Sequence, residues 1–161
     1  MDISFDINNE TGDQLRIALS YYDSETISAF SLDPCVLCLV FYDVTLVRMH
    51  GEGHVDYHTL NMVSDTLARF LDENADTVLC FYCDDLNDIE RSNTTITPQE
   101  YRSRLFSKMF DRYVKTHHQT AFINHCIKII IDDTPRFAHF ICRKEYESAV
   151  EALSAILMDK P

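Results

Sequence analysis

The sequence predicts an α+β fold, a mainly antiparallel sheet of about six strands with three amphipathic helices, in a single domain over residues 1–161. One ground is that apolar residues recur at the strand period of two in some segments and at the helix period in others. Another is the order of these segments, a strand meander followed by a helix, a strand, a helix, a β-hairpin and a helix. The size also fits, since 161 residues of which 46% are hydrophobic suit one compact core.

Six segments have the composition of strands. The first two alternate around a turn that contains Gly12, which favours an antiparallel pair. Residues 77–82 (TVLCFY) are apolar on both alternating faces, which is typical of a central strand covered on both sides. The last two flank Asp132-Asp133-Thr134-Pro135, a sequence that favours a hairpin connection. The expected strands are residues 3–7, 15–19, 35–47, 77–82, 121–131 and 137–142.

Three segments have the periodicity of amphipathic helices. Asp56 is an N-cap candidate for a helix to about Leu71, and a third helix is expected over residues 144–158. Between them, Thr97-Pro98-Gln99-Glu100 has the pattern of a capping box and begins a helix to about Lys115. On this middle helix the residues expected to face the core are Tyr101, Leu105, Phe106, Met109, Phe110 and Tyr113.

Charge is unevenly distributed along the chain. The first 90 residues carry 18 Asp and Glu against 3 Lys and Arg, and the last 71 carry 8 against 11, so the formal charge is −15 in the first part and +3 in the second. A net charge of −12 argues against nucleic-acid binding, because such binding draws affinity from cations that neutralise phosphates. The asymmetry indicates a partner of opposite charge instead.

The composition predicts a cytoplasmic protein with no membrane span. The longest apolar run, residues 35–42, has eight residues, whereas a helix needs about 20 to cross a bilayer. The first nine residues lack the basic and apolar regions of a secretory signal. All six cysteines lie in apolar runs, where free thiols behave as small hydrophobic groups, so we expect a reducing compartment.

The segments VLCFYCDD, EYRSRLFSKMFDRY and IIIDDTPRFAHFICRK, followed by a terminal amphipathic helix, resemble an uncharacterised family of small bacterial proteins with a domain of unknown function. The shared pattern is a strand ending in Cys-Asp before a helix rich in Arg and Phe. The resemblance covers roughly residues 30–158. It implies an α+β domain and no established activity.

Three groups of residues are candidates for metal binding. Two CxxC pairs, Cys35 with Cys38 and Cys80 with Cys83, have zinc-site spacing, but residues three apart in a strand point to opposite faces, so buried thiols are expected. Three histidines recur every four residues, yet the intervening glycines disfavour a helix that would align them: His50, His54 and His58. We therefore expect no cofactor and less than one equivalent of zinc in the purified protein.

Four carboxylates follow two of the expected strands. Asp84 and Asp85 follow one strand, and Asp132 and Asp133 follow another. If those strands are neighbours and their ends coincide, the carboxylates could bind a divalent cation. Asp residues at strand ends otherwise serve turns.

A cationic ridge is expected on the middle helix, opposite its apolar stripe. Arg104, Lys108, Arg112 and Lys115 recur at helical spacing, with Arg102 nearby. This ridge is either a solvated helix face or a binding site for an acidic partner or another anion. No aromatic residues interleave with it to stack bases, which argues against single-stranded nucleic acid.

The leading functional hypothesis is a non-catalytic protein-interaction module, such as an immunity, antitoxin-like or regulatory partner. The three glycines cannot compose a Walker loop, a dinucleotide-binding turn or a nucleophile elbow. Three helices are too few to cover both faces of six strands, so we expect a homodimer or a protein partner. The alternative is a metal-assisted hydrolase or nuclease that uses Asp84, Asp85, Asp133 and a histidine.

Overall fold

The computed structural model describes residues 2–10, 12–51, 57–83 and 95–159, and it has the predicted α+β architecture. Its six strands form one sheet in the order β1-β2-β3-β4-β6-β5. Neighbours are antiparallel except β3 and β4, which are parallel and joined through α3. The strands are β1 (Ile3–Asn8), β2 (Gln14–Tyr22), β3 (Val40–His50), β4 (Thr77–Cys83), β5 (Phe122–Ile131) and β6 (Thr134–Arg143).

The described part of the chain contains five α-helices rather than the three expected. The additional two, α1 and α2, have five and four residues, too short to show the period of an amphipathic helix. The helices are α1 (Ser24–Ser28), α2 (Pro34–Leu37), α3 (Tyr57–Glu73), α4 (Pro98–His117) and α5 (Glu147–Asp159), with the short 3-10 helix η1 (Lys144–Tyr146) before α5. None of these helices is both long and apolar enough to span a membrane.

The prediction of a strand over residues 35–47 was wrong at its start, because β3 begins at Val40, five residues later. Asp33 caps α2 by accepting a hydrogen bond from the Cys35 backbone N–H at 2.9 Å, and Pro34 occupies the first helical position. A capping Asp followed by Pro favours a helical turn over the β-branched pattern that follows it. The first CxxC pair therefore lies at the surface, in α2 and its C-cap.

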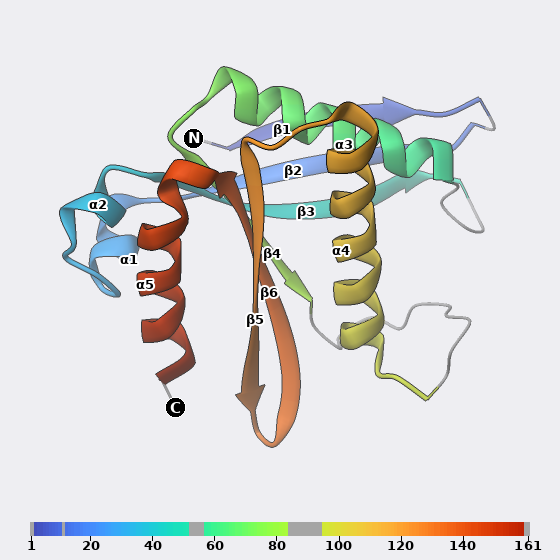
Figure 1. Cartoon of the computed structure of the whole chain (residues 1–161). Coiled ribbons are helices and arrows are strands. Elements are labelled where there is room, and N and C mark those ends of the chain that lie inside the picture. Colours follow the sequence, from blue (N-terminus) through green and yellow to red (C-terminus); the bar gives the residue numbers. More distant parts are fainter. Residues whose placement is uncertain (1, 11, 52–56, 84–94, 160–161) are drawn as a thin grey trace.

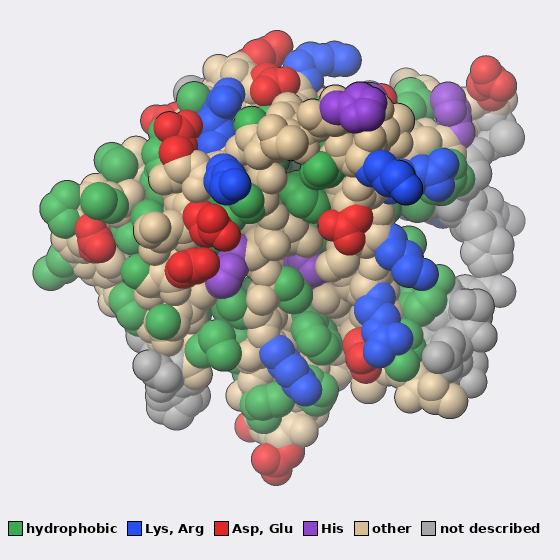
Figure 2. Space-filling view, viewed as in Figure 1, with side chains coloured by type: hydrophobic (Ala, Val, Ile, Leu, Met, Phe, Trp, Pro, Cys, Tyr) green, Lys and Arg blue, Asp and Glu red, His purple; other side chains and the backbone are tan. Residues whose placement is uncertain are grey.

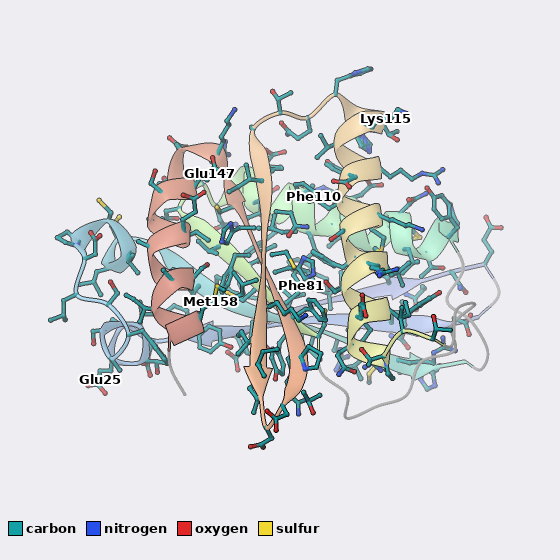
Figure 3. All side chains as sticks on the ribbon, turned by 60° about the horizontal axis from the view of Figure 1, so that its bottom comes forward. Glu25, Phe81, Phe110, Lys115, Glu147 and Met158 are labelled. Atoms are coloured by element: carbon teal, nitrogen blue, oxygen red, sulfur yellow. The ribbon has the colours of Figure 1, made fainter. Side chains whose placement is uncertain are left out.

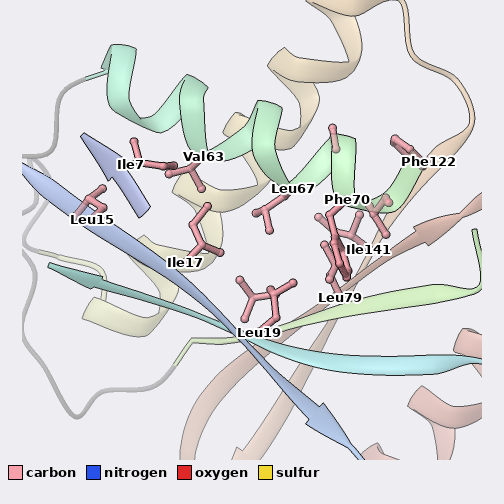
Figure 4. Packing of buried hydrophobic residues seen from close by; sticks show 13 residues of the cluster. Ile7, Leu15, Ile17, Leu19, Val63, Leu67, Phe70, Leu79, Phe122 and Ile141 are labelled. Carbon is pink, nitrogen blue, oxygen red and sulfur yellow. The ribbon is translucent and has the colours of Figure 1, made fainter. Parts of the chain in front are cut away.

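Two layers of helices cover the sheet. α3 and α4 pack on one face, and α5 with α1 and α2 packs on the other. Figure 1 shows α4 and α5 on opposite sides of the β5–β6 hairpin, with α3 lying over β1 and β2. The main core is formed under α3, whose Val63, Leu67 and Phe70 point toward β1 and β2 (Figure 4).

Local signals explain the remaining element boundaries. Thr97 Oγ1 accepts from the Glu100 backbone N–H at 3.2 Å, which confirms the predicted start of α4. The β5–β6 connection is tighter than expected, because Asp132 and Asp133 alone make the turn, with φ of 51° and 60°. Two consecutive left-handed residues are typical of a type I′ hairpin, which Asp tolerates better than most residues.

Candidate functional site

The cationic ridge lies on the exposed side of α4, as its helical spacing predicts. Lys and Arg side chains follow the outer side of this helix in Figure 2. Arg104 is engaged locally, with Nη2 2.8 Å from Glu100 Oε1. The guanidinium of Arg112 lies 3.8 Å from the centroid of the Tyr57 ring of α3. Among the described residues of the ridge, Lys108 and Lys115 have no hydrogen-bond or ion-pair partner, so they carry its available charge.

The described residues do not assemble the proposed metal sites. His54, Asp84 and Asp85 lie outside them. His50 ends β3 and His58 lies in the first turn of α3, both exposed. Asp133 is used by the hairpin turn. Within the described ranges, no group of three or more His, Cys, Asp or Glu side chains is placed to hold a metal ion.

The second CxxC pair lies in β4, where it was expected. Cys83 is buried and Cys80 is partly buried. Burial raises the pKa of Cys80 far above its ordinary value, which keeps this thiol protonated. A protonated thiol is a poor metal ligand, and the two residues point to opposite faces of the sheet. This geometry agrees with the expectation of buried thiols.

A polar cluster that the sequence did not indicate lies between α4 and the β5–β6 hairpin. Ser103 Oγ of α4 lies 2.8 Å from His139 Nε2 of β6, and His139 Nδ1 lies 3.0 Å from Asn124 Oδ1 of β5. Because an amide oxygen only accepts, Nδ1 carries the hydrogen and Nε2 accepts one from Ser103. Cys126 Sγ lies 3.6 Å from the same Nε2. A hydroxyl, an imidazole, an amide and a thiol are thus brought together from three elements.

The cluster resembles a catalytic triad in arrangement, but its chemistry is that of a buried structural network. The His139 side chain is completely buried, and this burial lowers its pKa to about 4, so the imidazole is neutral at physiological pH. Cys126 is exposed as a residue, yet its thiol lies against His139 and Ser103, and desolvation raises its pKa. A protonated thiol beside a weak, inaccessible base is not an activated nucleophile.

Sequence reasoning missed this cluster because its members sit in apolar patterns. Gln99 and Ser103 are the fully buried residues of α4, four positions apart on one side of the helix. Gln99 Nε2 donates to the Pro135 carbonyl at 3.0 Å. Two polar residues at helical spacing, opposite a histidine at an inward strand position, were the available signal.

The β5 strand forms an open edge of the sheet. It pairs with β6, and within the described residues no other strand pairs with it. Antiparallel residue pairs alternate between bonded and non-bonded ones. Ile131 and Thr134 close the hairpin as a bonded pair, and the hydrogen bond of 2.7 Å from Lys144 N to Ala121 O fits the same alternation at the other end. The residues of the intervening non-bonded pairs therefore direct their backbone N–H and C=O groups away from β6. These residues are Phe122, Asn124, Cys126, Lys128 and Ile130.

A cavity of about 1240 Å³ lies between α3, α4 and the sheet. Figure 3 places Phe81 of β4 and Phe110 of α4 in the space between the sheet and α4, and both rings line the cavity. The polar groups on its wall include Arg48 of β3, Tyr101 and Arg102 of α4. The apolar lining comes from α3, α4 and the strands, and includes Leu60, Leu67, Leu105, Phe106, Met109 and Tyr113.

The sequence matches no protein-family model, and no curated protein is significantly similar to it. The resemblance to a family of small bacterial proteins therefore stays a prediction. Three features of the described molecule are candidates for binding: the ridge, the open edge of β5 and the cavity.

Proposed function

We propose that this chain is a non-catalytic protein-interaction module, a regulatory, immunity or antitoxin-like partner, which binds an extended segment of another protein along the β5 edge. The observation that carries the proposal is the length and composition of this edge. β5 has ten residues, contains no proline and carries one charged side chain, Lys128. Natural sheets usually protect an exposed edge with charges, proline or a bulge, because its free backbone groups pair readily with another strand.

Charge on the two flanking helices supports a partner different from this chain. α5 contributes Glu147 and Glu151 on one side of the sheet, and α4 contributes Lys108 and Lys115 on the other. Figure 2 shows acidic side chains over the upper part of α5 and basic ones along α4. A partner strand with acidic residues toward α4 and basic residues toward α5 would complement both.

Self-pairing through the same edge is disfavoured by these charges. Two β5 strands pair antiparallel about a two-fold axis perpendicular to the sheet, which places the two copies of α4 on the same face. The two cationic ridges then lie on one face of the joined sheet and the two acidic α5 helices on the other, so like charges gather on each face. The ground that the sequence offered for a homodimer, three helices too few for both faces, does not hold, because helices pack on both faces of the sheet. The homodimer itself remains a prediction, which light scattering at low and high salt tests. Dimerisation through β5 should require high salt, which screens like charges.

The experiment removes one outward backbone donor. Lys128→Pro deletes an N–H that faces away from β6, a position where an edge strand tolerates proline. Lys128→Thr is the matched control, because it removes the same charge but keeps the N–H. We expect a partner isolated from the native host with the wild-type chain to bind Lys128→Thr within threefold of its wild-type affinity. Lys128→Pro should bind about tenfold more weakly or worse, measured by calorimetry, because a strand hydrogen bond is lost.

A second variant guards against misfolding of the proline variant. Ile130 is 57% exposed and its backbone also faces outward, so Ile130→Lys adds a charge at the edge without disturbing the core. It should weaken the same complex. Equal affinity for wild type, Lys128→Pro and Ile130→Lys would contradict binding along β5.

A further inference from the structure

We propose that the cavity between α3, α4 and the sheet is a binding site for a small amphipathic anion, with an apolar body held among the core side chains and one anionic group held by Arg48. Protein binding at the β5 edge does not use this cavity, so the two sites can be tested separately.

α4 packs loosely against the sheet along its apolar stripe. Its six apolar residues that were expected to face the core are all only partly buried, and every one of them lines the cavity. The residues of α4 that are fully buried are polar, Gln99 and Ser103. Phe106, Phe110 and Tyr113 pack partly against the main core, yet each residue of the stripe keeps exposed surface toward the cavity. A ligand in the cavity would remove that remaining hydrophobic surface from water.

The dimensions fit a small molecule. Ligand sites have volumes of about 300 to 1,000 Å³, and this cavity, at about 1240 Å³, holds a ligand of that size with some water. Its walls come from two helices and the sheet face between them, so the apolar lining lies below the outer surface. The accessible part of its wall includes the half-buried side chains Leu105, Phe106 and Met109. A slender apolar molecule between α4 and the sheet would contact them.

The charge on the wall selects an anion. Arg48 lines the cavity, is partly buried and has no ion-pair or hydrogen-bond partner among the described residues. Arg102 adds a second cationic side chain to the lining. Asp43, a carboxylate that also lines the cavity, already accepts hydrogen bonds from Thr45, at 3.4 Å, and from Tyr22. A guanidinium in such a setting binds carboxylate, sulfonate or phosphate groups.

The first measurement uses 1-anilinonaphthalene-8-sulfonate, an aromatic body with one sulfonate. We expect a saturable increase in fluorescence with one site per chain, and a rise in melting temperature, because a ligand that binds the folded state stabilises it. Met109→Trp places a large ring in the cavity and should reduce the affinity about tenfold or more. Binding that does not saturate, or that lowers the melting temperature, would overturn the proposal.

The second measurement separates the charge from the apolar body. Dodecanoate should displace the probe at a lower concentration than dodecanol does. Arg48→Gln should weaken the affinity for dodecanoate about tenfold and leave the affinity for dodecanol unchanged. Arg69→Gln is the matched control, because Arg69 is exposed on α3 and does not line the cavity. If Arg48→Gln and Arg69→Gln bind dodecanoate with equal affinity, Arg48 does not hold the anionic group and the proposal is wrong. Lys128→Pro should bind the probe normally, so this proposal and the β5 proposal fail separately.

Discussion

α3 and α4 are both long amphipathic helices on the same face of one sheet, yet they bury different kinds of residue. α3 buries Val63, Leu67, Ala68, Phe70 and Leu71, together with Thr59. α4 buries only Gln99 and Ser103, and its apolar stripe is half-buried around the cavity. The difference shows that helical periodicity predicts which side of a helix is apolar, but not what that side will contact.

The cause of the difference lies in connectivity. α3 joins the parallel strands β3 and β4, and a parallel connection requires its helix to cross back over the sheet. α4 follows β4 and is held by polar contacts to the β5–β6 hairpin, through Ser103 and Gln99. Phe106 also packs on Phe81 of β4, with ring centroids 4.1 Å apart. The position of α4 is therefore fixed by a few aromatic contacts and by hydrogen bonds, which hold the helix without filling all the space beside it.

The largest expected difference between the two helices is in stability. Leu67→Ala in α3 should lower the free energy of unfolding by about 2 to 5 kcal/mol, since this side chain is a buried member of the main core cluster. Phe110→Ala in α4 should cost about 1 to 2 kcal/mol, less than the usual cost of truncating a buried Phe, because the ring is partly buried beside existing space. Urea titration of both variants measures the difference.

An equal loss for both variants would contradict the difference in packing between the two helices. It would mean that the Phe110 ring is packed as tightly as Leu67 and that α4 closes tightly over the sheet. A larger loss for Phe110→Ala than for Leu67→Ala would place the main core under α4.

The second prediction concerns the pH dependence of stability. His139 is protonated below its ordinary pKa of 6.5 in the unfolded chain, but only below a pKa of about 4 when folded. Between these values the unfolded chain binds more protons, so the free energy of unfolding falls as pH falls from 6.5 to 4. The contribution lost is about 3 kcal/mol for a shift of this size.

The variant His139→Gln isolates this effect, because its amide does not titrate. The difference in unfolding free energy between wild type and His139→Gln should shrink steadily over that pH range and then level off. A difference that is constant with pH would show that the imidazole is not desolvated beneath α4.

The fold could be predicted from the sequence largely because its signals are local. Alternation around Gly12 identified the β1–β2 hairpin, and the Thr97 cap identified the start of α4. The helix start at Asp33 and Pro34 was missed, because the apolar run that follows it has the pattern of a strand. The sequence therefore predicted a strand where α2 forms. Parallel pairing of β3 with β4 and the final strand order depend on contacts between distant segments, which periodicity does not encode.

The candidate sites were harder to predict than the fold. The exposed ridge follows from helical spacing alone, so Lys108 and Lys115 were found. The polar cluster depends on Ser103, Asn124 and His139 meeting across elements, and each alone reads as an isolated polar residue in an apolar segment. The cavity depends on how several elements pack together, so no single residue in the sequence predicts it.

The third prediction compares one serine in each helix. Ser103→Ala in α4 should cost about 1 to 2 kcal/mol, because it removes the donor to a buried imidazole nitrogen. Ser64→Ala in α3 should change stability by less than about 0.5 kcal/mol, because the Ser64 hydroxyl donates to the Leu60 carbonyl of its own helix, at 3.2 Å, and to no other group in the described part of the chain. Denaturant unfolding distinguishes the two. Similar values would mean that Cys126 replaces Ser103 as the donor.

The smallest expected effects are on the outer faces of the two helices, where the environments should be alike. Arg104→Ala removes an exposed pair with Glu100, four residues earlier on α4, and should cost no more than about 0.5 kcal/mol. That cost should disappear in high salt, because an exposed pair is screened. Arg69→Ala on α3 should change stability by a similarly small amount. A loss of more than about 1 kcal/mol for Arg104→Ala alone would mean that the ridge supports the packing of α4, and that this helix is held from its outer side as well as by the polar cluster beneath it.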